Sequence, residues 1–236
     1  MIYRIADFNI DIAPIYGATA KILEPYLYEQ HVAADFSVFA TEMEIAEMDI
    51  EFEEFYGDTK HNSAYIERLV LHKKISDELL SRDAFMMHGA LIEYEGVGYM
   101  FTAQSGTGKT THVELWKKVF GNDVHIVNGD KPVLRIIDGE IYGYGTPWCG
   151  KEGYNINTRV KLSKLCFLAR GEENSIGNIS EIEAISRLMS QVQIADSRDL
   201  GAQLSMLDVL VSQCDMYLLK CNMDAEAATV AYNGMK

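Results

Sequence analysis

A glycine-rich stretch, AQSGTGKTT over residues 103–111, carries the residue types that bind phosphate groups. It fits the pattern G-x-x-x-x-G-K-[ST], except that its first position is alanine. Gly106 and Gly108 would let the backbone wrap closely enough for successive N–H groups to face phosphate oxygens. Lys109 would add a mobile positive charge, and the hydroxyl of Thr110 would bind Mg²⁺. The string Ser-Gly-x-Gly-Lys-Thr, found here at 105–110, occurs by chance in about one chain of this length in a thousand. This disfavours the alternative of a glycine turn with an incidental Lys-Thr pair.

An acid that could hold the metal follows the next expected strand. Residues 124–127 form a short apolar run that leads into Asn128-Gly129-Asp130. Carboxyl ends of strands lie beside the phosphates in sites of this kind, so we expect Asp130 to complete a magnesium site. The alternative is an aspartate that only shapes a turn.

The elements around these residues are those of an α/β chain. Two hairpins are expected, with turns at Glu95-Gly96 and Asp138-Gly139, and they predict a mixed, largely antiparallel sheet. Strands are also expected at 2–12, 35–41, 50–56, 165–168 and 216–219. Helices are expected over 63–82, from the glycine-rich stretch to residue 120, after the Ser180–Glu183 capping pair, and over 200–211 and 225–232. We therefore predict one compact domain over 1–236, with an acidic strand-rich part at 1–62 and a core at 63–236.

Charge and composition exclude several classes of protein. The net charge of the 236 residues is −14, and residues 1–60 hold 13 acidic side chains against three basic ones. Nucleic acids and anionic membranes are therefore unsuitable partners. The acidic segment reads either as a solvated surface or as a docking face for a basic partner. Four cysteines without zinc-ligand spacing, no secretory signal and no apolar run of ~18–20 residues together predict a cytoplasmic protein with reduced thiols.

The combination resembles the HPr kinase/phosphorylase and phosphoenolpyruvate carboxykinase superfamily. The resemblance rests on SGTGKTT at 105–111, on His88-Gly89 one hairpin upstream and on Asp130 one strand downstream. It extends over about residues 85–235 to short HPr-kinase-like proteins of anaerobic bacteria, through blocks such as Asp130-Lys131-Pro132, GTPWCGK at 145–151 and CNMD at 221–224. It implies the P-loop fold of that superfamily.

The resemblance also implies roles for individual residues. ATP phosphates would be held by Ser105, Gly106, Thr107, Gly108, Lys109, Thr110 and Thr111, and Mg²⁺ by Thr110 with Asp130. His88 would sit beside the reacting hydroxyl or steer the acid that takes its proton; the alternative is a packed strand residue. Lys151 would neutralise charge on the transferred phosphoryl group, or is a surface lysine. HPr kinases commonly show two adjacent aspartates, and here Gly129 replaces the first.

Three functions remain open on this basis. The leading one is an ATP- and Mg²⁺-dependent kinase that phosphorylates a hydroxyl, either on a serine of a small protein or peptide or on a small-molecule alcohol. The second is an enzyme like phosphoenolpyruvate carboxykinase, although that family is much longer. The third is a nucleotide-binding module without catalysis, which the absence of the first aspartate motivates. Since HPr kinases assemble as hexamers, a homo-oligomer is a further expectation.

Overall fold

The computed structural model describes residues 1–57, 62–193 and 200–236. Contacts group the chain into two compact units, Met1–Leu79 and Leu80–Lys236, and each is described by itself. The boundary lies at the end of a helix, so the helix expected over 63–82 belongs with the N-terminal unit. That the chain forms a single domain stays a prediction.

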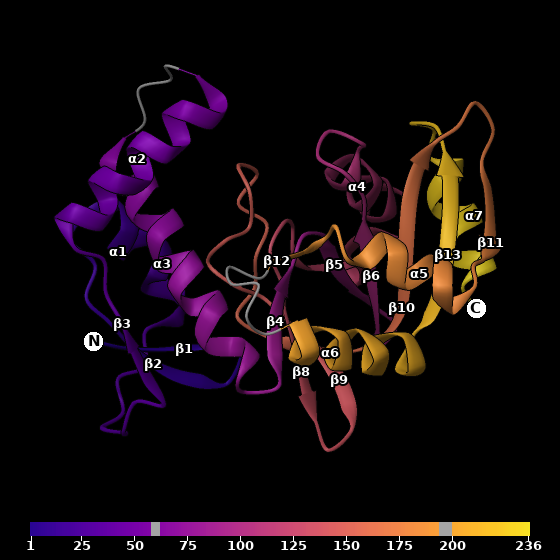
Figure 1. Cartoon of the computed structure of the whole chain (residues 1–236). Helices are drawn as coiled ribbons and strands as arrows, with labels where there is room; N and C mark the ends of the chain where they lie inside the picture. The colour runs from indigo at the N-terminus through magenta and orange to yellow at the C-terminus, as the bar shows by residue number, and fades with distance from the viewer. Residues whose placement is uncertain (58–61, 194–199) are drawn as a thin grey trace. The chain divides into compact units, whose positions relative to one another are not determined.

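The N-terminal unit combines a small sheet with helices (Figure 1). Its strands are β1 (Ile2–Ile5), β2 (Phe8–Ile12) and β3 (Phe36–Val38), in the order β1-β2-β3. β1 pairs with β2 antiparallel, and β3 joins β2 in parallel. Its helices are α1 (Gly17–Leu23), the 3₁₀ turn η1 (Glu24–Tyr26), α2 (Glu42–Tyr56) and α3 (Ser63–Leu80).

The strand predicted at 50–56 was wrong, because these residues form the second half of α2. Thr41 begins the helix with a capping box: its hydroxyl accepts from the Glu44 N–H at 3.2 Å, and its own N–H donates to the Glu44 carboxylate at 2.8 Å. The helix buries Ile45 but leaves Ile50 exposed. With so little of its surface buried, α2 carries no clear 3.6-residue pattern that would have revealed it.

The larger unit holds the glycine-rich stretch and Asp130. Its strands are β4 (Ala84–Met87), β5 (Ala90–Tyr94), β6 (Val97–Thr102), β7 (His125–Asn128), β8 (Val133–Ile137), β9 (Glu140–Tyr144), β10 (Arg159–Arg170), β11 (Ser175–Asn178), β12 (Val192–Gln193) and β13 (Asp215–Cys221). Its helices are α4 (Lys109–Phe120), the 3₁₀ turn η2 (Gly121–Asp123), α5 (Glu181–Leu188), α6 (Leu200–Gln213) and α7 (Glu226–Gly234).

These strands form one mixed, curled sheet, in the order β12-β4-β8-β9-β10-β6-β5-β7, with β13 beside β10 and β11 beside β13. β6 and β13 pair with β10 in parallel, and every other pairing of this sheet in the described ranges is antiparallel. The predicted mixed, largely antiparallel sheet is therefore confirmed. Both hairpins are confirmed as well, since Glu95-Gly96 (φ 53° and 78°) and Asp138-Gly139 (φ 53° and 80°) make the tight turns.

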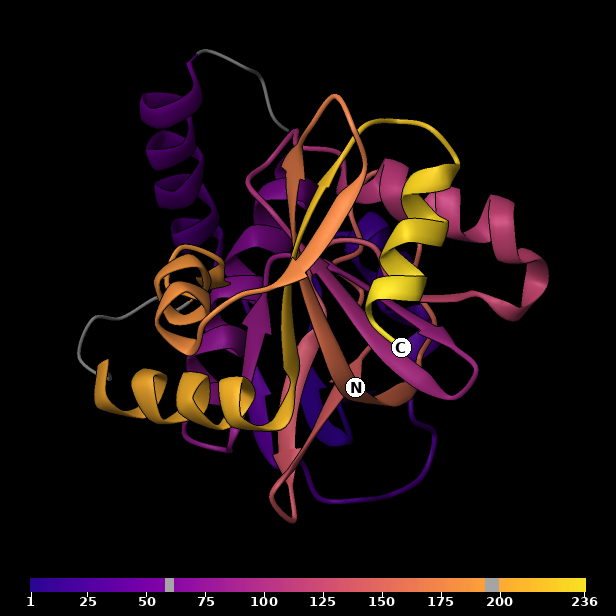
Figure 2. The same ribbon diagram turned by 90° about the vertical axis from the view of Figure 1, so that its right-hand side faces the viewer.

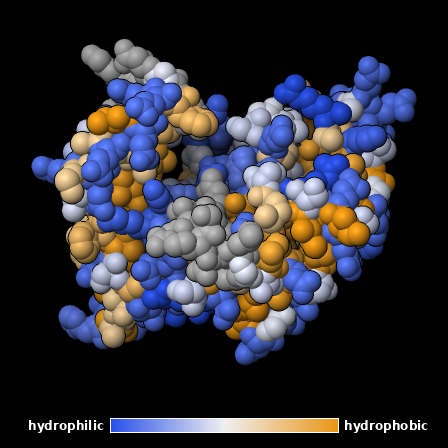
Figure 3. All heavy atoms as spheres, viewed as in Figure 1, coloured by the Kyte–Doolittle hydropathy of each residue, from blue (hydrophilic) through white to orange (hydrophobic). Residues whose placement is uncertain are grey.

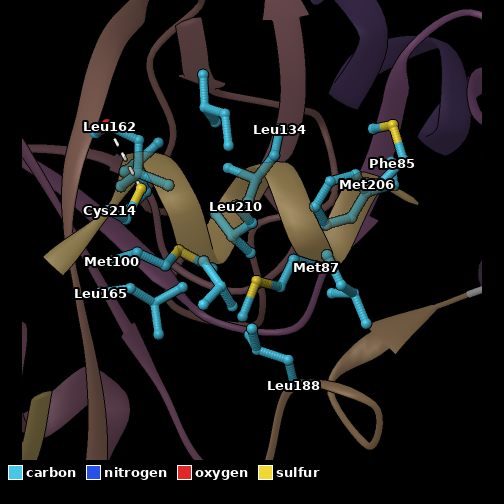
Figure 4. Close-up of a cluster of buried hydrophobic side chains, with 14 of the residues drawn as sticks. Phe85, Met87, Met100, Leu134, Leu162, Leu165, Leu188, Met206, Leu210 and Cys214 are labelled. Carbon is cyan, nitrogen blue, oxygen red and sulfur yellow. Dashed lines mark hydrogen bonds between the residues drawn. The ribbon is translucent and has the colours of Figure 1, made fainter. Parts of the chain in front are cut away.

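Helices cover both faces of this sheet. Figure 2 shows α7 beside α4, and both pack on one face, where Trp116 contacts Phe101 at 5.5 Å between ring centroids. The other face packs against α5 and α6. Figure 4 shows part of that second core, in which Leu210 lies among sheet residues and the Cys214 thiol bonds to the Leu162 carbonyl.

The surface is mixed in character. On the face seen in Figure 3, hydrophilic side chains are interspersed with apolar ones in both units. No helix in the described ranges combines the length and apolar character that crossing a bilayer requires.

Candidate functional site

The glycine-rich stretch joins β6 to α4. β6 ends at Thr102 and α4 begins at Lys109, with Gly108 as its N-cap. Gly106 (φ 76°) and Gly108 (φ 118°) both adopt left-handed conformations, which glycine reaches without strain. The first N–H groups of a helix lack partners within the helix, so this loop presents donors together with the positive end of the α4 dipole. Phosphate binds readily to such an arrangement.

Lys109 is folded back onto its own loop. The residue is only 8% exposed, and its ammonium donates to the Ala103 carbonyl at 2.9 Å. Burial lowers the pKa of Lys109, and the nearby Asp130 carboxylate opposes that change. The ammonium therefore donates to a neutral carbonyl group and lies near a carboxylate. A phosphate that enters the loop can compete with that carbonyl for the ammonium.

His88 and Asp130 are brought together beside this loop. His88 lies between β4 and β5, and its Nε2 is 3.4 Å from Oδ1 of Asp130, two residues after β7. The backbone fixes both: the Gly89 N–H donates to the Asp130 carbonyl at 2.9 Å, and the Thr102 hydroxyl donates to the His88 carbonyl at 2.8 Å. Since Thr102 is the last residue before the glycine-rich loop, the pair is tied to the loop's entrance.

Asp130 lies among positive groups. Burial alone would raise its pKa, but the hydrogen bond from His88 and the charges of Lys131, His88 and Lys109 together outweigh burial, so the pKa lies below its usual range. Burial lowers the pKa of Lys131, again opposed by Asp130. Two partly or fully buried lysines thus share one ionised carboxylate, which leaves net positive charge for an anionic ligand.

The glycine at position 129 has a packing reason. A Cβ atom added there would lie 3.0 Å from the Cys149 carbonyl oxygen and 3.3 Å from Cβ of Tyr154. The backbone N–H of Gly129 also donates to the Tyr154 carbonyl at 2.8 Å. The segment around residues 149–154 would therefore have to shift slightly to admit a side chain at position 129.

The remaining predicted residues lie as follows. Ser105 and Gly106 are exposed, whereas Thr107, Gly108, Thr110 and Thr111 are partly exposed. Lys151 is exposed on a turn that follows Gly150, and a Cβ at Gly150 would lie 3.4 Å from Cβ of Asp130. The turn that carries Lys151 thus adjoins Asp130, while no hydrogen bond or ion pair between Lys151 and another described residue supports a role.

Sequence reasoning missed three residues that shape this region. In the sequence, Lys131 was noted only within the block Asp130-Lys131-Pro132. In the structure it is a second lysine, after Lys109, that lies partly buried near the Asp130 carboxylate. Asn128 holds the Asp130 turn through its side-chain carbonyl, a role that its place two residues before an aspartate could have suggested. Arg170 donates to the Gly106 carbonyl at 2.8 Å across 64 residues of sequence, and no local signal reveals such a contact.

Two hollows lie away from this region. One, of about 450 Å³, is lined by residues that include Glu93, His125 and Arg159, and another, of about 240 Å³, adjoins it at His125 and Ile156. Neither is lined by the glycine-rich loop, His88 or Asp130.

Comparison with known proteins adds little to this geometry. No family model matches the sequence, and no curated protein matches it. Among solved structures, the chain is similar to the Hpr(Ser) kinase/phosphatase from Coxiella burnetii, with 10% sequence identity over 63% of this chain and 94% of that one. The TM-score of this match is 0.36.

Proposed function

We propose that this protein is an ATP- and Mg²⁺-dependent kinase that transfers a phosphoryl group to a hydroxyl, on a serine of a small protein or peptide or on a small-molecule alcohol. The observation that carries the proposal is the buried Lys109 ammonium at the start of α4, held on the glycine-rich loop within electrostatic reach of Asp130. Loop, lysine and acid are the parts that phosphoryl transfer requires.

The donor set suits magnesium rather than a cation held by the protein alone. Within the described residues there is no group of three or more His, Cys, Asp or Glu side chains placed to hold a metal. Mg²⁺ usually binds through one or two carboxylates plus substrate phosphates and keeps several waters. Asp130 and the Thr110 hydroxyl would hold it against the phosphates, where it would neutralise their charge.

The proposed reaction needs little covalent chemistry from the protein. The acceptor oxygen forms a bond to the γ-phosphorus while the bond from that phosphorus to the bridging oxygen breaks and ADP leaves. We assign the acceptor's proton to His88, whose Nε2 lies 3.4 Å from Oδ1 of Asp130. Lys109 and Lys131 would balance the charge on the phosphate oxygens.

One observation favours a second candidate, a nucleotide-binding module without turnover. A Cβ atom at Gly129, the position of the missing first aspartate, would lie 3.0 Å from the Cys149 carbonyl oxygen, so a side chain there requires the neighbouring segment to shift. Under this candidate the loop binds nucleotide, and no phosphoryl group leaves it. Under an activity like that of phosphoenolpyruvate carboxykinase, turnover would instead require oxaloacetate.

Calorimetric titration with MgATP tests the binding part. We expect Lys109→Ala to weaken binding by roughly 10- to 150-fold, because a charge-assisted hydrogen bond contributes about 1.5–3 kcal/mol. Lys117→Ala removes an exposed lysine near the other end of α4 and should leave affinity unchanged. Equal affinity of wild type and Lys109→Ala would refute the assignment of the loop.

Transfer of label from γ-labelled ATP tests the reaction. A panel of serine peptides and small alcohols should include an acceptor that becomes labelled, with ADP as the other product. Tight binding of MgATP without label transfer to any acceptor would select the non-catalytic module, and turnover only with oxaloacetate would select the carboxykinase-like activity.

A further inference from the structure

Strands β10 and β13 extend past the start of the glycine-rich loop. β6, β10 and β13 are parallel neighbours, so their carboxyl ends meet at one edge of the sheet (Figure 1). The last pair between β6 and β10 is Thr102 with Phe167, whereas β10 and β13 stay paired as far as Arg170 with Cys221. At ~3.3 Å per residue, these two strands extend about 10 Å past the start of the loop. The carboxyl-terminal ends of β10 and β13 therefore lie alongside the loop.

Arg170 is the last residue of β10, and its side chain is on the face of the sheet that carries α4. Successive side chains of a strand alternate between faces, and Cys166 and Leu168 pack in the core that contains Trp116 of α4. Arg170 follows them on the same face, and its Nη2 donates to the Gly106 carbonyl at 2.8 Å. Arg170 is an exposed residue, and this hydrogen bond anchors one edge of its planar guanidinium to the loop.

The segments behind Arg170 are joined to each other by hydrogen bonds. The Gly171 N–H donates to the Cys221 carbonyl at 2.9 Å. The Asn222 backbone N–H donates to the Asn174 side chain at 3.0 Å, and the Asn222 side chain donates to the Glu172 carbonyl at 3.1 Å. These bonds join the turns after β10 and β13, residues 171–174 and 221–224. We call these two joined turns the shelf.

The two sides of the loop differ in chemistry. On the β5 and β7 side lie His88, Asp130 and Lys131, which suit phosphate transfer. On the β10 side lie one anchored guanidinium and the shelf at residues 171–174 and 221–224, which carries the amides of Asn174 and Asn222 and the carboxylates of Glu172, Glu173 and Asp224. A nucleotide extends from its terminal phosphate to its base, so a terminal phosphate near Asp130 directs the other end toward Arg170.

We propose that Arg170 and the shelf behind it form the nucleoside subsite, with the base of the nucleotide stacked on the Arg170 guanidinium. This inference rests on the proposed binding of nucleotide triphosphate by the glycine-rich loop. Guanidinium groups stack on aromatic rings, and anchoring at Gly106 holds the plane in advance of binding. Arg170 then selects a nucleotide over a bare polyphosphate.

Parallel titrations with MgATP and magnesium tripolyphosphate test this subsite, because the second ligand has the phosphate chain without a nucleoside. We expect Arg170→Ala to weaken MgATP by about tenfold or more and tripolyphosphate by less than about twofold. Arg170→Lys keeps the charge but loses the plane, so it should weaken MgATP similarly. Lys220→Ala is the matched control, since Lys220 is exposed on β13 and lies on the opposite face of the sheet from Arg170. It should change neither affinity.

Each other outcome is decisive. Equal weakening of both ligands by Arg170→Ala would make Arg170 a phosphate contact and overturn the subsite, as would no weakening of either. Wild type that binds tripolyphosphate as tightly as MgATP would overturn the subsite while leaving the phosphate loop standing. Wild type that binds neither ligand would refute the proposed function and the subsite together.

Discussion

The buried side-chain amide of Asn128 lies against Thr146 and links the two segments that enclose the acid. Its Nδ2 donates to the Thr146 carbonyl and hydroxyl oxygens, at 3.1 Å each, while its Oδ1 accepts from the Asp130 N–H at 2.9 Å and from the Lys131 N–H at 2.7 Å. The Thr146 hydroxyl in turn donates to the Lys131 carbonyl at 2.7 Å. One fully buried amide therefore fixes the turn that presents Asp130.

We predict that Asn128→Ala lowers the free energy of unfolding by about 2–4 kcal/mol, because it leaves several buried polar groups without partners. Urea denaturation of the isolated variants measures this change. Asn178→Ala, at an exposed position of β11, is the control and should stay within about 0.5 kcal/mol of wild type. An unchanged midpoint for Asn128→Ala would contradict the role of this amide.

Gly129 gives a second stability prediction. Gly129→Ala places a methyl group 3.0 Å from the Cys149 carbonyl oxygen, so we expect a loss of about 1–3 kcal/mol. Gly177→Ala, where the added atom meets nothing within 4 Å, should be neutral or stabilising by about 0.5 kcal/mol. The same crowding predicts that Gly129→Asp fails to gain a second functional acid. Equal stability of the two alanine variants would refute this account.

The parts of the fold that the sequence predicted are those with local causes. Asp138-Gly139 and Glu95-Gly96 impose their turns through backbone conformation alone, and both hairpins follow. The helix after the glycine-rich loop follows from Val113 and Trp116, which are both fully buried. Two elements without a clear periodic pattern were missed: α2, which buries little of its surface, and the short strand β12, which depends on its pairing with β4.

The residues of the candidate site also divide into those with local sequence signals and those that depend on distant segments. Lys109 and Asp130 were predicted because motif spacing and strand ends are visible in a sequence. Arg170 and the crowding at Gly129 depend on segments that meet only in the folded chain, through the Gly106 carbonyl and the Cys149 carbonyl. Spacing could therefore mark the glycine-rich loop and Asp130 as candidates, but it could not reveal the neighbours that contact them in the fold.

The capping box of α2 allows its helical assignment to be tested. Thr41→Ala removes the side-chain acceptor of the Glu44 N–H, and we expect a loss of about 1 kcal/mol with an earlier loss of helical circular dichroism on heating. Ser37→Ala, at an exposed position of β3, is the control and should leave the helical signal unchanged. If residues 42–56 were extended, Thr41→Ala would behave like the control.

The lowered pKa of Asp130 predicts a pH-dependent contribution to stability. The native state favours the ionised carboxylate, so its contribution is present above the unfolded pKa of about 4 and is lost as pH falls through the lowered native value. Asp130→Asn should therefore be less stable than wild type near neutral pH, and the gap should close in acid. Urea titrations across pH measure it. Asp138→Asn, in an exposed turn, should show no such trend; a gap that widens in acid would refute the sign.

His88 tests the proposed transfer itself. Its backbone N–H donates to the Gln191 carbonyl at 2.9 Å and its carbonyl accepts from Thr102, so both bonds survive in His88→Ala and the variant should fold. We expect nearly unchanged MgATP affinity and turnover reduced by roughly 10²–10⁴-fold, the usual value of general-base help. His125→Ala, at a histidine 55% exposed, should change neither.

Melting curves recorded beside label-transfer assays distinguish His88 as a general base from His88 as a packed strand residue. A folded variant with full turnover would remove His88 from the mechanism, and lowered stability without a specific loss of rate would make it a packed strand residue.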